Sequence, residues 1–191
     1  MNTKPVVRLL SILVLFSLHV GAHAASITMT PSLQSAMPGD AVSFDVFFDF
    51  TDQATLGGGF DVFFDDSVLT FVGWTNTCPS PNPCDADFNR DPDIGDGILT
   101  GIGFGNFGGI GTSEMLGTLT FEINAGAMNG FTSLSMADNN VPAGPFIDLS
   151  TFQPIAVNYD GADIEIVPIP AAAWLLLGGI GTLFGLRRRV A

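Results

Sequence analysis

The central part of this 191-residue chain contains no histidine, no lysine and a single arginine, Arg90. The only two histidines, His19 and His23, and the only lysine, Lys4, lie near the N-terminus. Their absence elsewhere excludes histidine-based triads, lysine bases and histidine-ligated metals. Carboxylate pairs, as used by glycosidases, are compatible with the composition, but no pair stands out. We therefore expect a protein that is not an enzyme.

Positive charge is scarce throughout the central part. All 19 acidic residues lie between Asp40 and Glu165, where Arg90 is the only base, so the net charge there is 1 − 19 = −18. Nucleic-acid phosphates are bound mainly through Lys and Arg, so we expect no nucleic-acid partner. Such a surface also repels anionic polymers unless divalent cations bridge it. Neutral sugars, Ca²⁺ and protein contacts are the interactions that this charge favours.

The first 24 residues have the order of features that is typical of export. Lys4 and Arg8 precede a short apolar run, and the small residues Ala22 and Ala24 follow it. This order predicts a secretory signal peptide that is cleaved after Ala24. A retained membrane anchor is the alternative, but the apolar run is short for a span of about 20 residues.

The C-terminal segment, residues 167–191, has the composition of a membrane span. Residues 169–186 carry no charge, and Arg187, Arg188 and Arg189 follow directly. These 186 − 169 + 1 = 18 residues predict a transmembrane helix of roughly 27 Å, close to the ~30 Å hydrocarbon core. By the positive-inside rule the three arginines stay in the cytoplasm, which places the acidic part outside.

The start of this segment carries a family resemblance. Val167-Pro168-Ile169-Pro170, then small residues with Trp174, a glycine-containing apolar span and an arginine tail resemble the PEP-CTERM sorting signal. In that family an exosortase, an integral-membrane transpeptidase, recognises the proline-containing motif in Gram-negative bacteria that make exopolysaccharide. Ile169 replaces the glutamate that is commoner at its position. The resemblance implies an exported surface or matrix protein, with an exosortase as processing partner and the C-terminal helix as a transient anchor.

The central part alternates apolar and polar residues, which predicts half-buried β-strands. In residues 43–50 the phenylalanines 44, 48 and 50 share one face with Val46, and the hexapeptide Phe-Asp-Val-Phe-Phe-Asp at 44–49 recurs at 60–65. The Gly-rich link between the two copies predicts that they are adjacent antiparallel strands. Further strands are expected near residues 27–29, 68–74, 98–104, 114–124, 134–136, 155–159 and 162–166. Many short strands with Gly, Pro and Asn between them indicate an all-β, antiparallel sandwich.

The central part contains, in this order, the motifs Pro38-Gly39-Asp40, Asp65-Asp66-Ser67-Val68-Leu69 and Leu116-Gly117-Thr118-Leu119-Thr120-Phe121. This order of turns and strands resembles a cohesin-type domain over residues 25–166. That family is a nine-stranded jelly-roll sandwich shared with some carbohydrate-binding modules, and the cohesins of cellulosomes bind dockerins. The resemblance implies the fold and assigns no binding residues. Taken together with the sorting signal, it leads us to expect a non-enzymatic protein with a binding or scaffolding role in exopolysaccharide. A carbohydrate-binding module and a protein–protein adhesin are the alternatives.

Cys78 and Cys84 flank a proline-rich pentapeptide. In an exported chain, two cysteines at this spacing predict a disulfide that closes a small loop. A reactive dithiol is the alternative, although such pairs have closer spacing and lie at a helix N-terminus.

The segment after Cys84 has oxygen ligands at positions 1, 3, 5, 7, 9 and 12, the spacing of an EF-hand loop. We expect a Ca²⁺ site there, although Arg90 replaces the usual glycine and no helices flank the loop. A solvated acidic loop is the alternative, and both interpretations remain open. The expected ligands are Asp85, Asp87, Asn89, Asp91, Asp93 and Asp96.

Two other patterns suggest ligands. Residues 103–108 match Gly-x-Gly-x-x-Gly, but no helical pattern follows, so we expect a flexible loop or bulged strand and no organic cofactor. Phe47 and Phe63 fall on the polar side of the alternation, and exposed aromatic rings on neighbouring strands can stack on sugars. The alternative is that the two rings pack under a loop or in a second small core.

Overall fold

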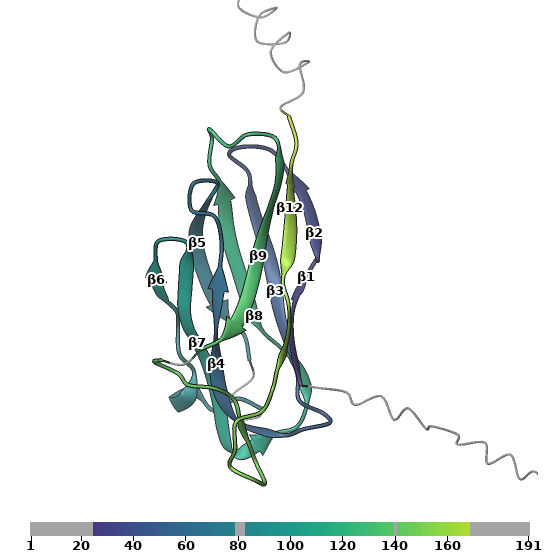
Figure 1. The fold of residues 1–191 in the computed structure, drawn as a ribbon, viewed down its shortest axis with the longest axis vertical. Helices are drawn as coiled ribbons and strands as arrows, with labels where there is room; N and C mark the ends of the chain where they lie inside the picture. Colours follow the sequence, from purple (N-terminus) through teal and green to yellow (C-terminus); the bar gives the residue numbers. More distant parts are fainter. Residues whose placement is uncertain (1–24, 79–82, 140, 169–191) are drawn as a thin grey trace, which may run out of the picture.

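A computed structural model describes residues 25–78, 83–139 and 141–168, which form a sandwich of two facing β-sheets (Figure 1). The first sheet has the order β11-β1-β3-β8-β5, and the second has the order β2-β12-β9-β4-β7-β6, with β10 paired to β4. The elements are β1 (Ser26–Thr30), β2 (Leu33–Ala36), β3 (Ala41–Asp49), β4 (Thr55–Phe63), β5 (Leu69–Asn76), the 3-10 helix η1 (Ala86–Phe88), β6 (Asp93–Gly95), β7 (Ile98–Ile110), β8 (Ser113–Ile123), β9 (Gly130–Asp138), β10 (Ile147–Asp148), β11 (Asn158–Asp160) and β12 (Ala162–Ile166). The all-β sandwich expected from the sequence is confirmed.

The two ends of the chain, with the expected signal peptide (1–24) and transmembrane helix (169–186), lie outside the described residues. Within the described ranges, no helix is both long enough and apolar enough to cross a membrane.

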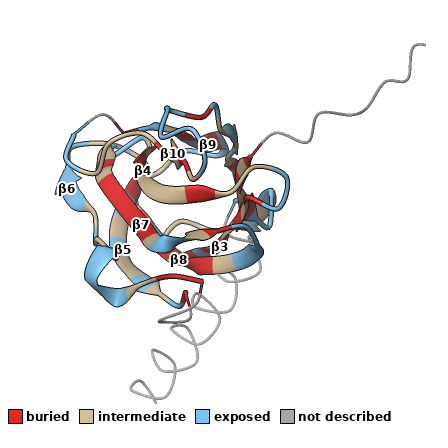
Figure 2. Ribbon diagram, turned by 90° about the horizontal axis from the view of Figure 1, so that it is seen from below, coloured by how far each residue is buried: buried red, intermediate tan, exposed pale blue. Residues whose placement is uncertain are grey.

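Alternation builds the core between the sheets. Phe44 and Phe48 on β3 are buried, and the register sets Phe44 opposite the buried Leu119 of β8. The ring of Phe48 stacks on that of Phe104, a β7 residue of the second sheet, with 4.9 Å between centroids. Buried segments of β7 and β8 are visible when the sandwich is viewed from its end (Figure 2). Burying one such ring stabilises the fold by about 1.5–3 kcal/mol, so these contacts hold the two sheets together.

The expectation that the two hexapeptide copies are adjacent strands is wrong. β3 pairs with β1 and β8, whereas β4 pairs with β7, β9 and β10, so the two copies lie in different sheets. Residues 57–59, which we expected in the link, are part of β4. Each copy directs its apolar face into the shared core, because alternation determines which face of a strand is buried and leaves its neighbours open.

Most strand pairs are antiparallel, as expected, but two are parallel. β1 pairs with β11, and β2 with β12. β1 and β2 follow each other in the chain yet lie in different sheets, and the same is true of β11 and β12. The first strands of the domain therefore lie beside the last ones, in both sheets (Figure 1).

Candidate functional site

The expected disulfide between Cys78 and Cys84 is present, with 5.8 Å between the Cα atoms. Both cysteines are buried. The bond connects the end of β5 in the first sheet to the segment that precedes η1. That segment is attached to the second sheet, because the backbone N–H of Asp85 donates to the carbonyl of Gly105 on β7 at 2.9 Å. The disulfide therefore fixes the start of the acidic segment.

Contacts within the acidic segment involve several of the expected Ca²⁺ ligands. Asp85 caps η1 by accepting a hydrogen bond from the backbone N–H of Asp87, and Asn89 ends the helix. The carboxylate of Asp93 pairs with Arg90 at 2.7 Å. Across residues 25–78, 83–139 and 141–168, no group of three or more Asp, Glu, His or Cys side chains is arranged to hold a metal ion. The Ca²⁺ site remains a prediction to which the geometry adds no support. The other two expected ligands, Asp91 and Asp96, are exposed.

Phe47 and Phe63 lie on different sheets, so the neighbouring-strand arrangement that we expected for sugar stacking is wrong. Phe47 is half-buried on the outer side of β3, and Phe63 is 39 % exposed on the outer side of β4. The two rings therefore do not form one platform. Glycan binding at either ring alone is untested.

The expected sorting motif, residues 167–170, begins where the sandwich ends. The backbone N–H of Val167 donates to the carbonyl of Ala36 at 2.9 Å, directly after β12. Pro168 is the last residue described. Ile169 and Pro170 lie outside the described residues, as do the three arginines expected to stop the span, Arg187, Arg188 and Arg189.

A cleft of about 460 Å³ lies over β4 and β7. The backbones of four glycines, 57 and 58 on β4 and 103 and 105 on β7, form its floor. Residues 87–90, which we call the η1 wall, line one side, and residues 143, 145 and 147, which we call the β10 wall, line the other. The sequence analysis missed this cleft, although its signal was present in the glycine runs at 57–59 and 101–105.

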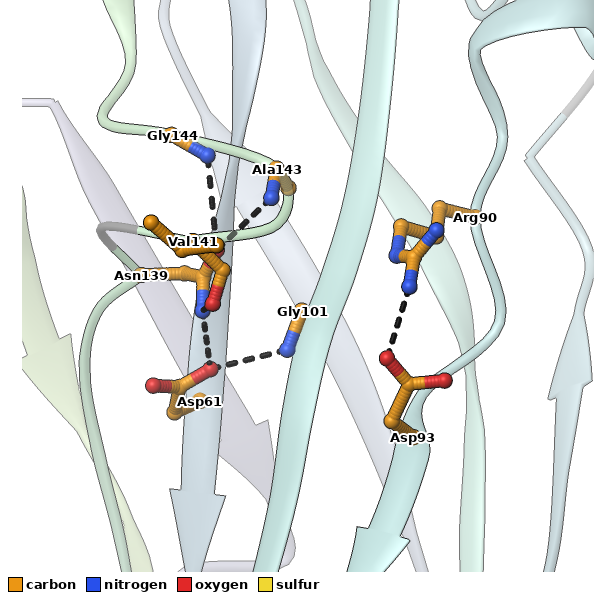
Figure 3. Close-up of polar contacts among 8 residues, drawn as sticks. All are labelled: Asp61, Arg90, Asp93, Gly101, Asn139, Val141, Ala143 and Gly144. Atoms are coloured by element: carbon orange, nitrogen blue, oxygen red, sulfur yellow. Dashed lines mark hydrogen bonds and ion pairs between the residues drawn. The ribbon is translucent and has the colours of Figure 1, made fainter.

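A buried asparagine holds the β10 wall in place. Asn139, 1 % exposed, donates from Nδ2 to Asp61 Oδ1 at 2.7 Å and to the carbonyl of Val141 at 2.9 Å. Its Oδ1 accepts from the backbone N–H of Ala143 at 2.8 Å. Asp61 Oδ1 also accepts from the backbone N–H of Gly101 at 2.8 Å, so this one carboxylate connects β4, β7 and the loop (Figure 3).

Two glycines of β4 allow the β10 wall to lie close to the backbone of that strand. A Cβ atom on Gly59 would lie 2.4 Å from the Cβ of Ala143, and one on Gly58 would lie 2.5 Å from the backbone of Phe146. Real Cβ atoms do not tolerate such contacts, so any side chain at these positions would push the wall away.

The η1 wall is attached to β7 by its backbone. Arg90 and Gly103 exchange two backbone hydrogen bonds, of 2.9 and 3.2 Å. Two side-chain atoms of this wall, Asn89 Oδ1 and Arg90 Nε, are enclosed and have no hydrogen-bond partner among the described residues. Each such group is destabilising by about 1–3 kcal/mol unless something pairs with it. The ring of Phe88, in the same wall, packs edge-on against that of Phe107, with 4.6 Å between the centroids.

Two ionisable groups have strongly shifted pKa values, and both shifts have structural causes. Hydrogen bonds from Ser150, Gln53 and Thr151 hold the pKa of Asp148 well below its usual range. Burial, together with the hydrogen bond that its hydroxyl donates to Asp138, raises the pKa of Tyr159. Asp148 closes the turn that follows the β10 wall, and Tyr159 lines a second hollow of about 730 Å³ beside β12.

Comparison with known proteins supports the fold alone. No protein-family model and no curated protein matches the chain. Its structure is similar to that of the cohesin CaCohA2 from Clostridium acetobutylicum, with a TM-score of 0.58 and 17 % identity over 75 % of this chain and 92 % of that one. It is similar to the cohesin of a type I cohesin–dockerin complex from Clostridium thermocellum, with a TM-score of 0.59 and 15 % identity over 75 % and 99 %. It is also similar to a non-cellulosomal cohesin from the archaeon Archaeoglobus fulgidus, with a TM-score of 0.52 and 14 % identity over 78 % of this chain and 96 % of that one. The chain therefore has a cohesin-like β-sandwich fold.

Proposed function

We propose that this protein is an exported, non-enzymatic binding and scaffolding module of the cell surface or extracellular matrix. The observation that carries the proposal is the cohesin-like sandwich, because a solved structure of this fold is a complex with a dockerin, a protein partner. The disulfide between Cys78 and Cys84 supports export, since such bonds persist in oxidising compartments.

The outer face of β3, β8 and β5 is the surface that we propose for the protein partner. Hydrogen bonds across the strands order its polar side chains: Thr118 donates to Asp45 at 2.7 Å, and Ser43 and Thr120 lie 3.0 Å apart. Val72, at the bulge of β5, is 59 % exposed. The domain carries 1 − 19 = −18 charges between residues 40 and 165. Charge complementarity therefore favours a partner with a basic surface.

The protein partner is tested by crosslinking and affinity capture from the culture matrix of the producing bacterium, using the exported chain as bait. We expect one captured protein that also binds the purified chain directly, more weakly as salt increases. Glu122→Lys, on the proposed face, should abolish this binding, whereas the matched control Asp163→Lys, at an exposed position of β12 in the second sheet, should not. Direct binding that is equal in both variants would contradict the proposed face.

Processing by an exosortase, and association with exopolysaccharide, form the second part of the proposal. Both rest on residues 167–191 and their resemblance to the PEP-CTERM signal. Mass spectrometry of the exported form, from strains with and without the exosortase, tests the processing step. We expect a mature C-terminus near Pro168 or Pro170 in the first strain only, and an uncut tail in both strains would overturn this part.

A further inference from the structure

The η1 wall of the cleft carries two unpaired side-chain atoms of opposite kind. Arg90 Nε is a donor and Asn89 Oδ1 is an acceptor, and both are enclosed without a partner among the described residues. Asp93 holds the Nη2 atom of Arg90 but leaves Nε free. The Arg90 side chain as a whole is 41 % exposed, whereas its Nε atom is enclosed. A hydroxyl group, which both donates and accepts, pairs with an atom of either kind.

The aromatic ring of Phe88 lines this cleft, and a second ring packs against it. Phe88, 38 % exposed, belongs to the η1 wall, and Phe107, 79 % exposed, packs edge-on against it with 4.6 Å between centroids. The face of an aromatic ring carries partial negative charge and attracts polarised C–H groups. A ligand with C–H groups on one side and hydroxyl groups on the other fits both features.

The charges around the cleft favour a neutral ligand. Asp93 neutralises Arg90, the only base between residues 40 and 165, and Asp87 is part of the same wall. An anionic ligand therefore meets a surface that repels it.

The backbone of the floor argues against an extended peptide. Peptides that add to a sheet use free main-chain groups. Here the carbonyls of Gly103 and Gly105 accept hydrogen bonds from the backbone N–H groups of Arg90 and Asp85, both at 2.9 Å. Recognition therefore depends on the side chains of the two walls.

We propose that this cleft binds a neutral saccharide unit, with Asn89 and Arg90 hydrogen-bonding to its hydroxyl groups and Phe88 packing against its C–H face. The volume of about 460 Å³ is within the range of small-molecule sites. The proposal deepens the proposed function, because it rests on the location of the protein in a polysaccharide matrix. It adds a sugar site on the second sheet to the protein-binding face on the first.

The test is direct binding of the purified full chain, kept in a detergent without a sugar headgroup, to immobilised neutral hexasaccharides and to uronate hexasaccharides. We expect binding to at least one neutral sugar and none to the uronates. Phe88→Ala and Asn89→Ala should each weaken binding at least tenfold. The matched controls Phe131→Ala, on a residue that is 71 % exposed on β9, and Asn129→Ala, in the β8–β9 loop, should leave it unchanged.

Thermal unfolding of each variant identifies any loss of binding that is due to misfolding. Failure of every neutral sugar to bind would overturn the proposal, and so would binding that the wall variants and the controls weaken equally. Preferential binding of uronates would overturn the charge argument. These outcomes are independent of the proposed protein partner, because that partner is tested with Glu122→Lys on the other sheet.

Discussion

Replacing Asn139 tests whether one side chain holds the β10 wall against the sheet. Asn139→Ala removes the charge-assisted hydrogen bond to Asp61, worth about 1.5–3 kcal/mol, and two neutral bonds worth about 1 kcal/mol each. It also removes a longer bond of 3.3 Å, which Asn139 accepts from the backbone N–H of Gly144. Water replaces part of this loss, because Val141 is exposed and Ala143 is half-buried. We therefore expect the free energy of unfolding to fall by about 3 kcal/mol.

Urea unfolding, followed by far-UV circular dichroism, measures this change. The control Asn129→Ala, at an exposed loop position, should change the free energy of unfolding by no more than about 0.5 kcal/mol. Near neutral pH, Asn139→Asp should lower the free energy of unfolding more than Asn139→Ala does, because it brings a second carboxylate against Asp61. The difference between the two variants should shrink on acidification. A loss below about 1 kcal/mol for Asn139→Ala would refute the reasoning, because the bonds to Asp61, Val141 and Ala143 would then be unimportant.

Three further predictions concern the disulfide, the floor of the cleft and the acid range. Replacing Cys78 and Cys84 together by alanine should lower the free energy of unfolding by about 2 kcal/mol in urea, since the bond closes a short loop; an unchanged midpoint would contradict this. Gly58→Ala should be destabilising by about 1–3 kcal/mol because its Cβ would meet the backbone of Phe146, whereas Gly73→Ala, with open space around it, should be nearly neutral; equal effects would refute the close-approach argument. Hydrogen bonds, that from Ser150 first, lower the pKa of Asp148, so its contribution to stability is complete above the ordinary value of 3.8 and is lost as the pH falls below it. Asp148→Asn should therefore flatten the dependence of the urea midpoint on pH between about pH 5 and pH 2, and parallel curves would contradict the shift.

The strands could be predicted from the sequence because burial acts residue by residue. Phe44, Val46 and Phe48 alternate with polar residues, and all three are buried on β3. Their sheet neighbours could not be predicted in the same way, since the copy at 60–65 has the same alternation and lies mostly on β4 in the opposite sheet. Pairing depends on contacts between residues far apart in the chain, and alternation contains no information about them.

The β8 strand shows a smaller failure of the same kind. Simple alternation places Met115 on the apolar face, but the register shifts at this point, and Leu116 is the residue that is fully buried. A bulge adds one residue to one strand, so every side chain beyond it changes face. The position of the bulge in β8 depends on the partner strand, β3.

The cleft was missed because its floor is formed by glycines, which have no side chains. Motif searches look for groups that perform chemistry, and Asn89 and Arg90 entered the sequence analysis only as parts of a Ca²⁺ loop. The glycines at 57–59, 103 and 105 had been assigned to a link and to a loop or bulged strand; the bulged strand is correct for β7, whose register with β4 shifts twice.

The direction of the strands relates the cleft to the end of the chain. β9 and β12 are antiparallel, with Gly130 opposite Ile166 and Leu134 opposite Ala162, so the loop that follows β9 lies at the end of the sandwich away from Pro168 (Figure 1). That loop supplies the β10 wall. If residues 167–191 hold the chain at the membrane before processing, as their resemblance to the PEP-CTERM signal implies, this wall points away from the bilayer and toward the surrounding matrix. The cleft should then bind saccharide while the protein is still anchored. The affinity of a neutral saccharide for the anchored protein, on cells that lack the exosortase, should therefore match its affinity for the released form.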